Sequence, residues 1–161
     1  MDVPIKLKVN GKEHDLQVEA KATLLEVLRE QLKIKSVHRS CQEGECGVCT
    51  VLLNGEPITS CLMLAVQANG CNITTVEGLL GEDGSLHPLM KSFVENHGFQ
   101  CGYCTSGFLL TAYALLNQSE KPTQEEIRKS IEGNLCRCTG YVNIVKSIEA
   151  AAEEKRAGDW W

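Results

Sequence analysis

The chain has 161 residues, of which 43% are hydrophobic and 23% are charged, and its formal net charge is −5. This length allows one domain or two small ones with a proper core. Acidic and basic residues are interspersed, which argues against nucleic-acid binding, because that function depends on basic patches.

No apolar run approaches the roughly 18 residues that a membrane span requires. The sequence opens directly with a strand pattern and shows neither a signal peptide nor a twin-arginine motif. We therefore expect a cytoplasmic protein without a membrane span.

The first segment reads as a β-hairpin. Apolar residues occupy alternate positions in it, at Ile5, Leu7, Val9, Leu16 and Val18. Asn10-Gly11 between the two runs is a type I′ turn signal, so we expect two antiparallel strands with one buried face.

A short helix and a cysteine-rich loop follow the hairpin. Thr23 and Glu26 have the spacing of a capping box, which marks a helix start. The apolar residues after Thr23 recur with helical spacing, at Leu24, Leu25, Val27, Leu28 and Leu32. In the loop after this helix, Gly44 and Gly47 allow the backbone to wrap closely and turn its amides inward.

A second hairpin and a last strand complete the first half. The hairpin is predicted from Thr50–Leu53, the turn Asn54-Gly55 and the segment 57–59, and it leads directly to Cys61. A further strand is expected over 73–76. Hairpin, helix, loop, hairpin and strand form the order of a β-grasp ferredoxin.

The composition changes at the three glycines between residues 78 and 84, and the remainder is predicted to be helical. Apolar periodicity and capping signals place four helices there, over 85–97, 108–116, 123–131 and 141–154. Short connections between four helices are typical of a small bundle. The fold class is therefore α+β, with a β-grasp plant-ferredoxin-like domain at 1–78 and an all-α four-helix bundle domain at 79–161.

Eight of the nine cysteines form two sets of four, with the spacings C-x4-C-x2-C-x11-C and C-x2-C-x31-C-x-C. The first cysteine set is Cys41, Cys46, Cys49 and Cys61, and the second cysteine set is Cys101, Cys104, Cys136 and Cys138. The C-x4-C-x2-C run is the plant-type [2Fe–2S] pattern, so we interpret each set as the ligands of one [2Fe–2S] cluster.

The surroundings of the second cysteine set favour an anionic cluster. Cys101 and Cys104 are expected at the start of the second predicted helix, and Cys136 and Cys138 just before the fourth. Free N–H groups and the helix dipole stabilise negative charge at such positions. Cys71 belongs to neither set and is predicted to be a small buried hydrophobic residue.

The cysteine pattern also allows three other interpretations. A disulfide framework is disfavoured because there is no secretory signal and one cysteine would be unpaired. Two structural zinc sites in a binding module remain an alternative, since zinc also takes four cysteines, although each set contains only one C-x2-C knuckle. A free-standing two-cluster ferredoxin is a third alternative, but the C-terminal half is larger than a carrier needs.

Three motifs carry a family resemblance. Cys41-x4-Cys46-Gly-Val-Cys49-Thr-Val, Gln100-Cys-Gly-Tyr-Cys104-Thr and Gly133-Asn-Leu-Cys-Arg-Cys-Thr-Gly-Tyr141 together resemble the small iron–sulfur subunit of the xanthine oxidase family of molybdenum hydroxylases. The likeness extends over nearly the whole chain. It implies an electron-transfer subunit of a molybdenum-dependent oxidoreductase, with no catalytic residue of its own.

The resemblance also implies partners. A large subunit would bind molybdopterin and a medium subunit would bind FAD, in a heterotrimer that can dimerise, and electrons would pass from molybdenum through both clusters toward the flavin. By the same resemblance, Gln100 and Cys138 would lie against the pterin. The tail 158–161, with two tryptophans, is a candidate docking feature.

Two positions depart from the family pattern. Ser40 stands where a glycine is usual before the first cysteine, and Ser106 stands where a proline is usual after the C-x2-C pair. Neither change removes a ligand, but both can affect loop rigidity and cluster potential. The four histidines, His14, His38, His87 and His97, are scattered and are expected at the surface or at helix caps.

Overall fold

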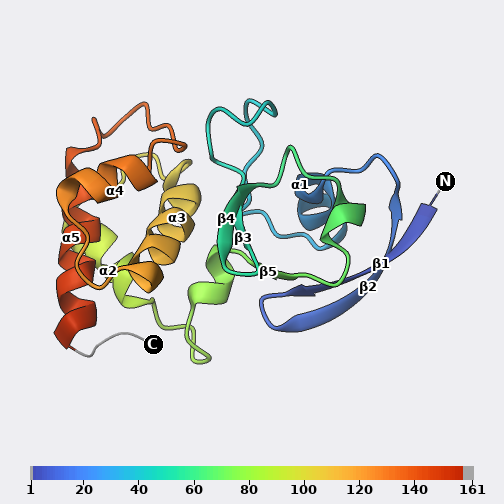
Figure 1. Ribbon diagram of the computed structural model, residues 1–161, viewed down its shortest axis with the longest axis horizontal. Coiled ribbons are helices and arrows are strands. Elements are labelled where there is room, and N and C mark those ends of the chain that lie inside the picture. The colour runs from blue at the N-terminus through green and yellow to red at the C-terminus, as the bar shows by residue number, and fades with distance from the viewer. Residues whose placement is uncertain (1, 158–161) are drawn as a thin grey trace.

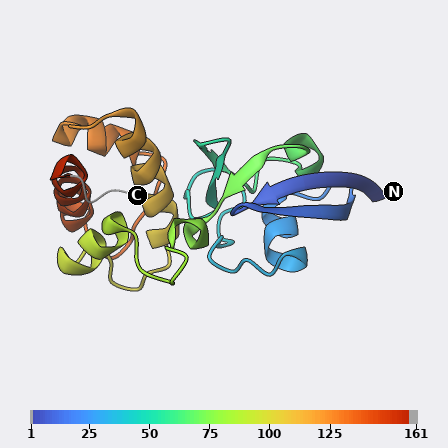
Figure 2. The same cartoon turned by 90° about the horizontal axis from the view of Figure 1, so that it is seen from below.

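The computed structural model describes residues 2–157. Its strands and its four longer helices occupy opposite ends of an elongated molecule, as Figure 1 and the perpendicular view in Figure 2 show. Within residues 2–157, no helix combines the length and the apolar character needed to cross a bilayer.

Five strands form one mixed sheet in the N-terminal half. They are β1 (Asp2–Val9), β2 (Lys12–Glu19), β3 (Thr50–Leu53), β4 (Glu56–Thr59) and β5 (Asn72–Thr74), in the order β2-β1-β5-β3-β4. β1 pairs with β5 in parallel, and the other pairs are antiparallel. Both predicted hairpins are confirmed, with positive φ angles of 49° and 79° at Asn10 and Gly11 and of 51° and 91° at Asn54 and Gly55.

The last strand ends earlier than predicted. β5 stops at Thr74, and Val76–Leu79 form the 3-10 turn η3 instead of continuing the strand. Thr75 explains the difference, because its N–H donates to Asn10 Oδ1 at 2.9 Å and its hydroxyl accepts from Asn10 Nδ2 at 2.8 Å. These bonds tie the chain to the first hairpin turn and direct it away from the sheet.

A capped helical segment covers the sheet. α1 (Leu24–Glu26) continues into a single wider turn, η1 (Val27–Gln31), and the Thr23–Glu26 capping box is present in both directions. The predicted apolar face is buried except for Leu32, which is half-buried. It packs on the sheet side chains to form the first hydrophobic core.

Four helices form the second core, as predicted. They are α2 (Pro88–Glu95), α3 (Thr105–Gln118), α4 (Gln124–Ser130) and α5 (Val142–Ala157). α3 is longer than the predicted 108–116 and is buried along most of its length. α4 opens with the predicted Thr123–Glu126 capping box.

The start of α2 differs from the prediction. The helix begins at Pro88, not at residue 85, because His87 is its N-cap and accepts a hydrogen bond from the Leu89 N–H at its Nδ1, 3.2 Å away. Proline at the first helical position fits this start, since its missing N–H is not needed there. Leu86 and Val94, two apolar residues of the predicted helix 85–97, are exposed.

The two halves are in contact. Leu52 of β3 and Leu79 of η3 belong to the core of the helical half. β3 and β4 lie against α3. The predicted domain boundary at 78/79 falls in η3 and stays a prediction.

Candidate metal centres

The first cysteine set is assembled by the loop before β3 and by the end of β4. Cys41 and Cys46 lie in the loop and are half-buried, whereas Cys49 and Cys61 are buried at the edge of the sheet. The Cys46 side chain lies close enough to Cys41 to affect its pKa, and the Cys61 side chain close enough to Cys49. Each of these thiols therefore has a second thiol of the same set as a neighbour.

Backbone amides point at one of these sulfurs. The Cys46 N–H donates to Cys41 Sγ at 3.4 Å. Hydrogen bonds from the Glu43 backbone, from the Cys46 thiol and from further amides lower the pKa of Cys41 to about 7. Gly44 and Gly47 have φ angles of +83° and +69°, the left-handed conformation that lets the loop turn its amides inward.

Burial acts in the opposite direction on Cys49 and raises the pKa of its thiol to about 11. A metal ligand must be the thiolate, so a bound cation would have to displace the Cys49 proton.

The second cysteine set lies between α3 and α5. Cys104 is the N-cap residue of α3 and Cys101 lies just before it, while Cys136 and Cys138 belong to the loop that leads to α5. The Sγ atoms of Cys101 and Cys138 are 3.7 Å apart. The Cys136 thiol lies close enough to Cys104 to affect its pKa, so these two thiols are neighbours as well.

Cys104 and Cys136, the two less exposed thiols of the second set, have contrasting environments. Burial raises the pKa of Cys104 to about 12. Burial also raises the pKa of Cys136, but hydrogen bonds from the Thr139 hydroxyl and N–H outweigh it, and the net direction is down. These donors lie 3.1 and 3.4 Å from Cys136 Sγ.

The distance between Cys101 and Cys138 tests whether these two thiols fit a shared metal. Two thiolates on one tetrahedral metal, each about 2.3 Å from it, lie about 3.8 Å apart, close to the 3.7 Å between Cys101 and Cys138. Among residues 2–157, no three Cys, His, Asp or Glu side chains are placed to hold a single metal ion. The 3.7 Å spacing fits two thiolates on one metal, as each iron of a [2Fe–2S] cluster requires.

Both cysteine sets reach one cavity of about 440 Å³ at the junction of the two halves. Cys46 of the first set lines it together with all four cysteines of the second. Cys101 and Cys138 are exposed. The second set is thus the more accessible of the two.

Gln100 and Cys138, predicted to face a pterin, are neighbours in the structure. The Gln100 Nε2 donates to the Cys138 carbonyl at 3.1 Å, and both side chains are exposed. Their orientation toward a pterin stays a prediction.

Other sequence expectations have mixed outcomes. Cys71 is half-buried, not buried, and lies in the turn before β5.

His87 is a helix cap, as expected. His38 is neither a cap nor a free surface residue: its ring stacks on Tyr103 with centroids 4.3 Å apart. The predicted docking tail, 158–161, lies outside the described residues.

Sequence reasoning missed Asn134. This side chain is 4% exposed and donates from its Nδ2 to the Gly47 carbonyl at 3.1 Å, across the junction. Its Oδ1 accepts from the Thr111 hydroxyl at 2.9 Å. The one available signal was its place two residues before Cys136, within the motif that begins at Gly133.

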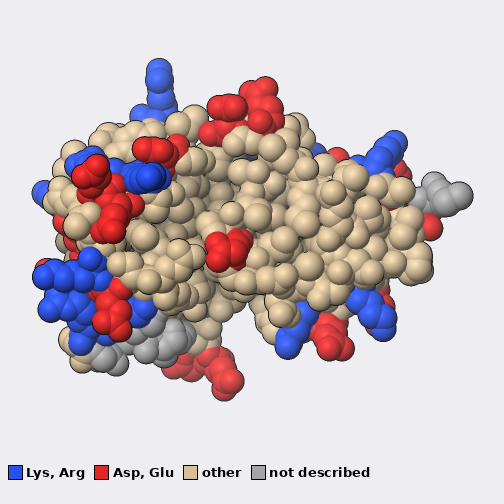
Figure 3. Space-filling model, viewed as in Figure 1, with Lys and Arg blue, Asp and Glu red and all other residues tan. Residues whose placement is uncertain are grey.

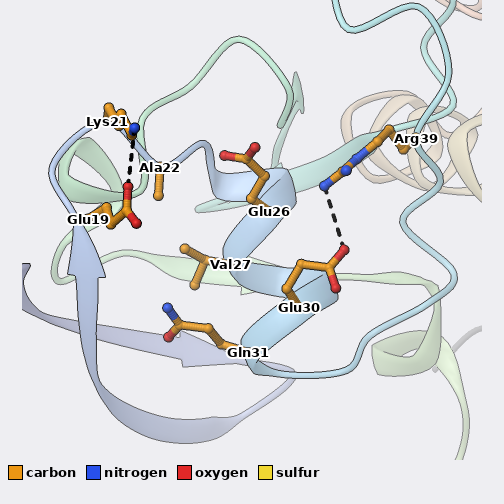
Figure 4. Close-up of a pocket in the computed structure, with 8 residues that line it drawn as sticks. All are labelled: Glu19, Lys21, Ala22, Glu26, Val27, Glu30, Gln31 and Arg39. Carbon is orange, nitrogen blue, oxygen red and sulfur yellow. Dashed lines mark ion pairs between the residues drawn. The ribbon is translucent and has the colours of Figure 1, made fainter.

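Charged side chains gather at the edges of the molecule. In the view of Figure 3, acidic groups cluster over the upper edge and mixed charges over the lower left, while the middle of the face is largely uncharged. A charged pocket of about 380 Å³ lies beside α1, and Figure 4 shows its ion pairs, Lys21–Glu19 at 3.5 Å and Arg39–Glu30 at 3.6 Å. It contains no cysteine, so it is separate from both thiol sets.

Comparison with known proteins assigns each half of the chain to a domain type. Residues 7–74 match the 2Fe-2S iron-sulfur cluster binding domain, and residues 75–149 match the [2Fe-2S] binding domain. The first match contains the first cysteine set, and the second match contains the second. These matches disfavour the zinc alternative.

The chain is also similar to whole subunits. It is 47% identical over 151 residues to the nicotinate dehydrogenase small FeS subunit of Eubacterium barkeri, a match that covers 94% of this chain and 96% of the relative. It is 43% identical over 167 residues to the aldehyde oxidoreductase iron-sulfur-binding subunit PaoA of Escherichia coli (strain K12), covering 94% and 72%. A chain in the crystal structure of quinoline 2-oxidoreductase from Pseudomonas putida 86 superposes with a TM-score of 0.92 at 44% identity, covering 98% of each chain.

Proposed function

Because the chain belongs to the small iron–sulfur subunits of molybdenum hydroxylases, the xanthine oxidase family, we propose that it relays electrons from a molybdopterin site on one partner subunit toward FAD on another. Each [2Fe–2S] cluster, when bound, supplies a centre that accepts and returns one electron. The chain itself carries no substrate chemistry. The partners would be a molybdopterin-binding large subunit and an FAD-binding medium subunit.

The observation that carries this proposal is that one cavity brings a thiol of the first set together with the second set. Cys46 of the first set and the whole second set line the same space, so two clusters held by these residues would be neighbours. Exposed Cys101 and Cys138 offer the second set to a partner, while Cys49 and Cys61 of the first set are buried in the sheet domain.

The residues around the thiols tune and shield the proposed clusters. Amides of the loop at 43–46 donate to Cys41, and Thr139 donates to Cys136. Hydrogen bonds to ligand sulfur raise a cluster's reduction potential because they stabilise added negative charge. Each set thus has its own donors with which the protein can set a separate potential.

Substrate selection would belong to the molybdenum partner. The relatives' names mention nicotinate, aldehyde and quinoline, which indicates that similar small subunits serve enzymes with different substrates. We propose that this chain, in the same way, contributes electron transfer and leaves the choice of substrate to its partner.

Metal analysis and EPR test the proposal. The purified chain should contain about four iron and four acid-labile sulfide, two of each per cluster. Cys46→Ser should remove one EPR signal of the reduced protein and Cys136→Ser the other. Stoichiometric zinc in a colourless protein would contradict the iron–sulfur assignment, and oxidation of a substrate by the lone chain would contradict the role as a relay subunit.

A further inference from the structure

We propose that three side chains of the helical half, Tyr103, Ser106 and Asn134, lock the ligand loop of the first cysteine set onto the second and act as positioning residues for electron transfer between the clusters. This inference rests on the proposed function only in that electrons pass between the two sites. The three residues are not ligands. Each reaches across the junction from a segment that carries ligands of the second set.

The segment immediately before Cys41 is held from the C-x2-C side. Ser106 Oγ donates to the Ser36 carbonyl at 2.8 Å, and Tyr103 OH donates to the Arg39 carbonyl at 2.7 Å. The Tyr103 ring also stacks on His38, with an interplanar angle of 21°. Tyr103 lies between Cys101 and Cys104 in the sequence, so a movement of these ligands is transmitted to the approach to Cys41.

The segment after Cys46 is held from the C-x-C side. The Asn134 Nδ2 donates to the Gly47 carbonyl at 3.1 Å, and the Leu135 N–H donates to the Cys46 carbonyl at 2.9 Å. The hydroxyl of Thr111 donates to Asn134 Oδ1 and fixes the orientation of the amide. The next residue after Leu135 is the ligand Cys136.

Close backbone packing makes this contact rigid. A Cβ at Gly47 would lie 2.2 Å from the Gly133 carbonyl, and one at Gly107 would lie 2.4 Å from the Gly47 carbonyl. Neither neighbour is a flexible side-chain end that could move aside. The loop of the first set therefore packs directly on the backbone of the helical half, with no room for an added Cβ at Gly47 or Gly107.

These contacts have one feature that ordinary domain packing does not require. Both ends of the stretch from Cys41 to Cys46 are fixed, and each group that donates to them across the junction lies within two residues of a second-set cysteine. Without the Asn134 amide, the Gly47 carbonyl keeps its bonds from Thr50 in its own half but loses its tie to the helical half. Without the Ser106 hydroxyl, the Ser36 carbonyl loses its cross-junction donor, so in either variant the loop is released from the second set at that end. Electron tunnelling weakens exponentially with distance, and movement of the released loop changes the spacing and orientation of the two sites.

The test compares cross-junction variants with a matched control in the cluster-loaded full chain. Asn134→Ala removes the buried amide, and Ser106→Ala removes only the hydroxyl at the start of α3. Ser92→Ala is the control, because Ser92 Oγ also donates to a buried carbonyl, that of Ser147 at 2.7 Å, but within the helical half. The readouts are iron and sulfide content, the thermal midpoint, and the magnetic splitting between the two EPR signals of the dithionite-reduced protein.

We expect Asn134→Ala and Ser106→Ala to narrow or abolish the splitting while the loaded protein keeps both EPR signals, and Ser92→Ala to lower the thermal midpoint with the splitting unchanged. If Asn134→Ala does not load, Ser106→Ala decides. Unchanged splitting in loaded Ser106→Ala, or an equal change in Ser92→Ala, overturns the inference. Because the splitting requires only two reduced clusters, this outcome is independent of whether a partner delivers or accepts electrons.

Discussion

The exposed side chain of Gln100 lies beside Cys138 of the second cysteine set. Its amide has two N–H groups and one oxygen. Within residues 2–157, one of these N–H groups donates to the Cys138 carbonyl. An exposed amide with spare donor capacity, next to an exposed thiol, suits a partner ring that carries both donors and acceptors. The contact of Gln100 with the pterin of a partner subunit stays a prediction.

Gln100→Ala tests that contact in the assembled enzyme. We expect both clusters to remain, but the cofactor to be retained less well or the second cluster to be reduced more slowly by substrate. Loss of one hydrogen bond corresponds to roughly 0.5–1.5 kcal/mol, or up to about tenfold in affinity. Molybdenum content and rapid-mixing reduction kinetics measure the two effects.

Gln118→Ala is the matched control for this change. Gln118 is also an exposed glutamine, and it lies on α3, outside the cysteine cavity. Its amide donates to Glu56 at 3.4 Å. If both variants show full cofactor occupancy and the same reduction kinetics, the role of Gln100 is limited to stabilising its own loop.

Among the structural elements, the loop that carries the first cysteine set depends on Gly47. The position combines a φ of +69° with the close approach of the Gly133 carbonyl, whereas Gly55 has a φ of +91° and nothing within 4 Å of an added Cβ. Gly55→Ala thus measures the conformational cost alone, about 1–2 kcal/mol for a left-handed residue. Gly47→Ala adds a backbone clash to that cost.

We therefore expect Gly47→Ala to destabilise the protein clearly more than Gly55→Ala. The first variant should also lose iron and sulfide on purification, while the second should keep both. Thermal midpoints and metal analysis check this. Similar losses in both variants would mean that the loop does not need its contact with the helical half.

Two capping boxes, one in each half, allow a second prediction about elements. Thr23→Ala removes a side-chain cap, a change that typically costs about 1 kcal/mol, and for a chain of this size shifts the thermal midpoint by about 2–4 °C. Thr123→Ala, with the same box at α4, is the comparison and should produce a shift of similar size.

The stability that the Thr23–Glu26 capping box contributes also depends on pH. Hydrogen bonds from the Thr23 backbone N–H lower the pKa of Glu26. A carboxyl with a lowered folded-state pKa stabilises the protein above its ordinary pKa and loses that contribution as the pH falls through the folded value. Thr23→Ala keeps the backbone N–H but removes the bond from the Thr23 hydroxyl to the Glu26 carboxylate. The part of the stability difference between wild type and Thr23→Ala that comes from this bond should therefore be full at neutral pH and lost in acid, while the part from the Glu26 N–H bond to the hydroxyl remains. A difference that does not change with pH would show that the bond from the hydroxyl to the carboxylate contributes nothing.

The same elements show which features the sequence could predict. Asn10-Gly11, Asn54-Gly55 and the two Thr-x-x-Glu boxes are local signals, and each produced the expected turn or helix start. The early end of β5 was missed because the bonds of Thr75 come from Asn10, 65 positions away in the sequence.

The site shows the same division between local and long-range information. The cysteine spacings predicted both sets. The cavity that they share and the contacts of Asn134 depend on how the two halves of the chain meet. Ser106 was identified only as a departure from a family pattern, and its hydrogen bond to the Ser36 carbonyl gives that departure a structural role.

At the scale of the whole molecule, the helical half presents apolar surface around the second cysteine set. Leu135 is 52% exposed and lines the cavity with the cysteines, together with the exposed ring of Tyr103. Phe99 and Val142, close in sequence to these ligands, are also exposed. Exposed apolar surface grouped around a functional site commonly marks an interface, and here it surrounds the thiols that the proposal assigns to the molybdopterin-binding partner.

Leu135→Asp tests this assignment, with Val94→Asp as the control. Val94 is equally exposed, at 50%, but lies on α2 and does not line the cavity. The Leu135 side chain can be changed while its backbone bond to Cys46 is kept. An unpaired carboxylate buried in an interface costs roughly 2 kcal/mol or more, which weakens binding at least about tenfold. In complexes purified through a tag on this chain, the ratio of molybdenum to iron should therefore fall for Leu135→Asp and stay at the wild-type value for Val94→Asp, with four iron per chain in both. A ratio that falls equally in both variants, or in neither, would place the partner on another face of the molecule.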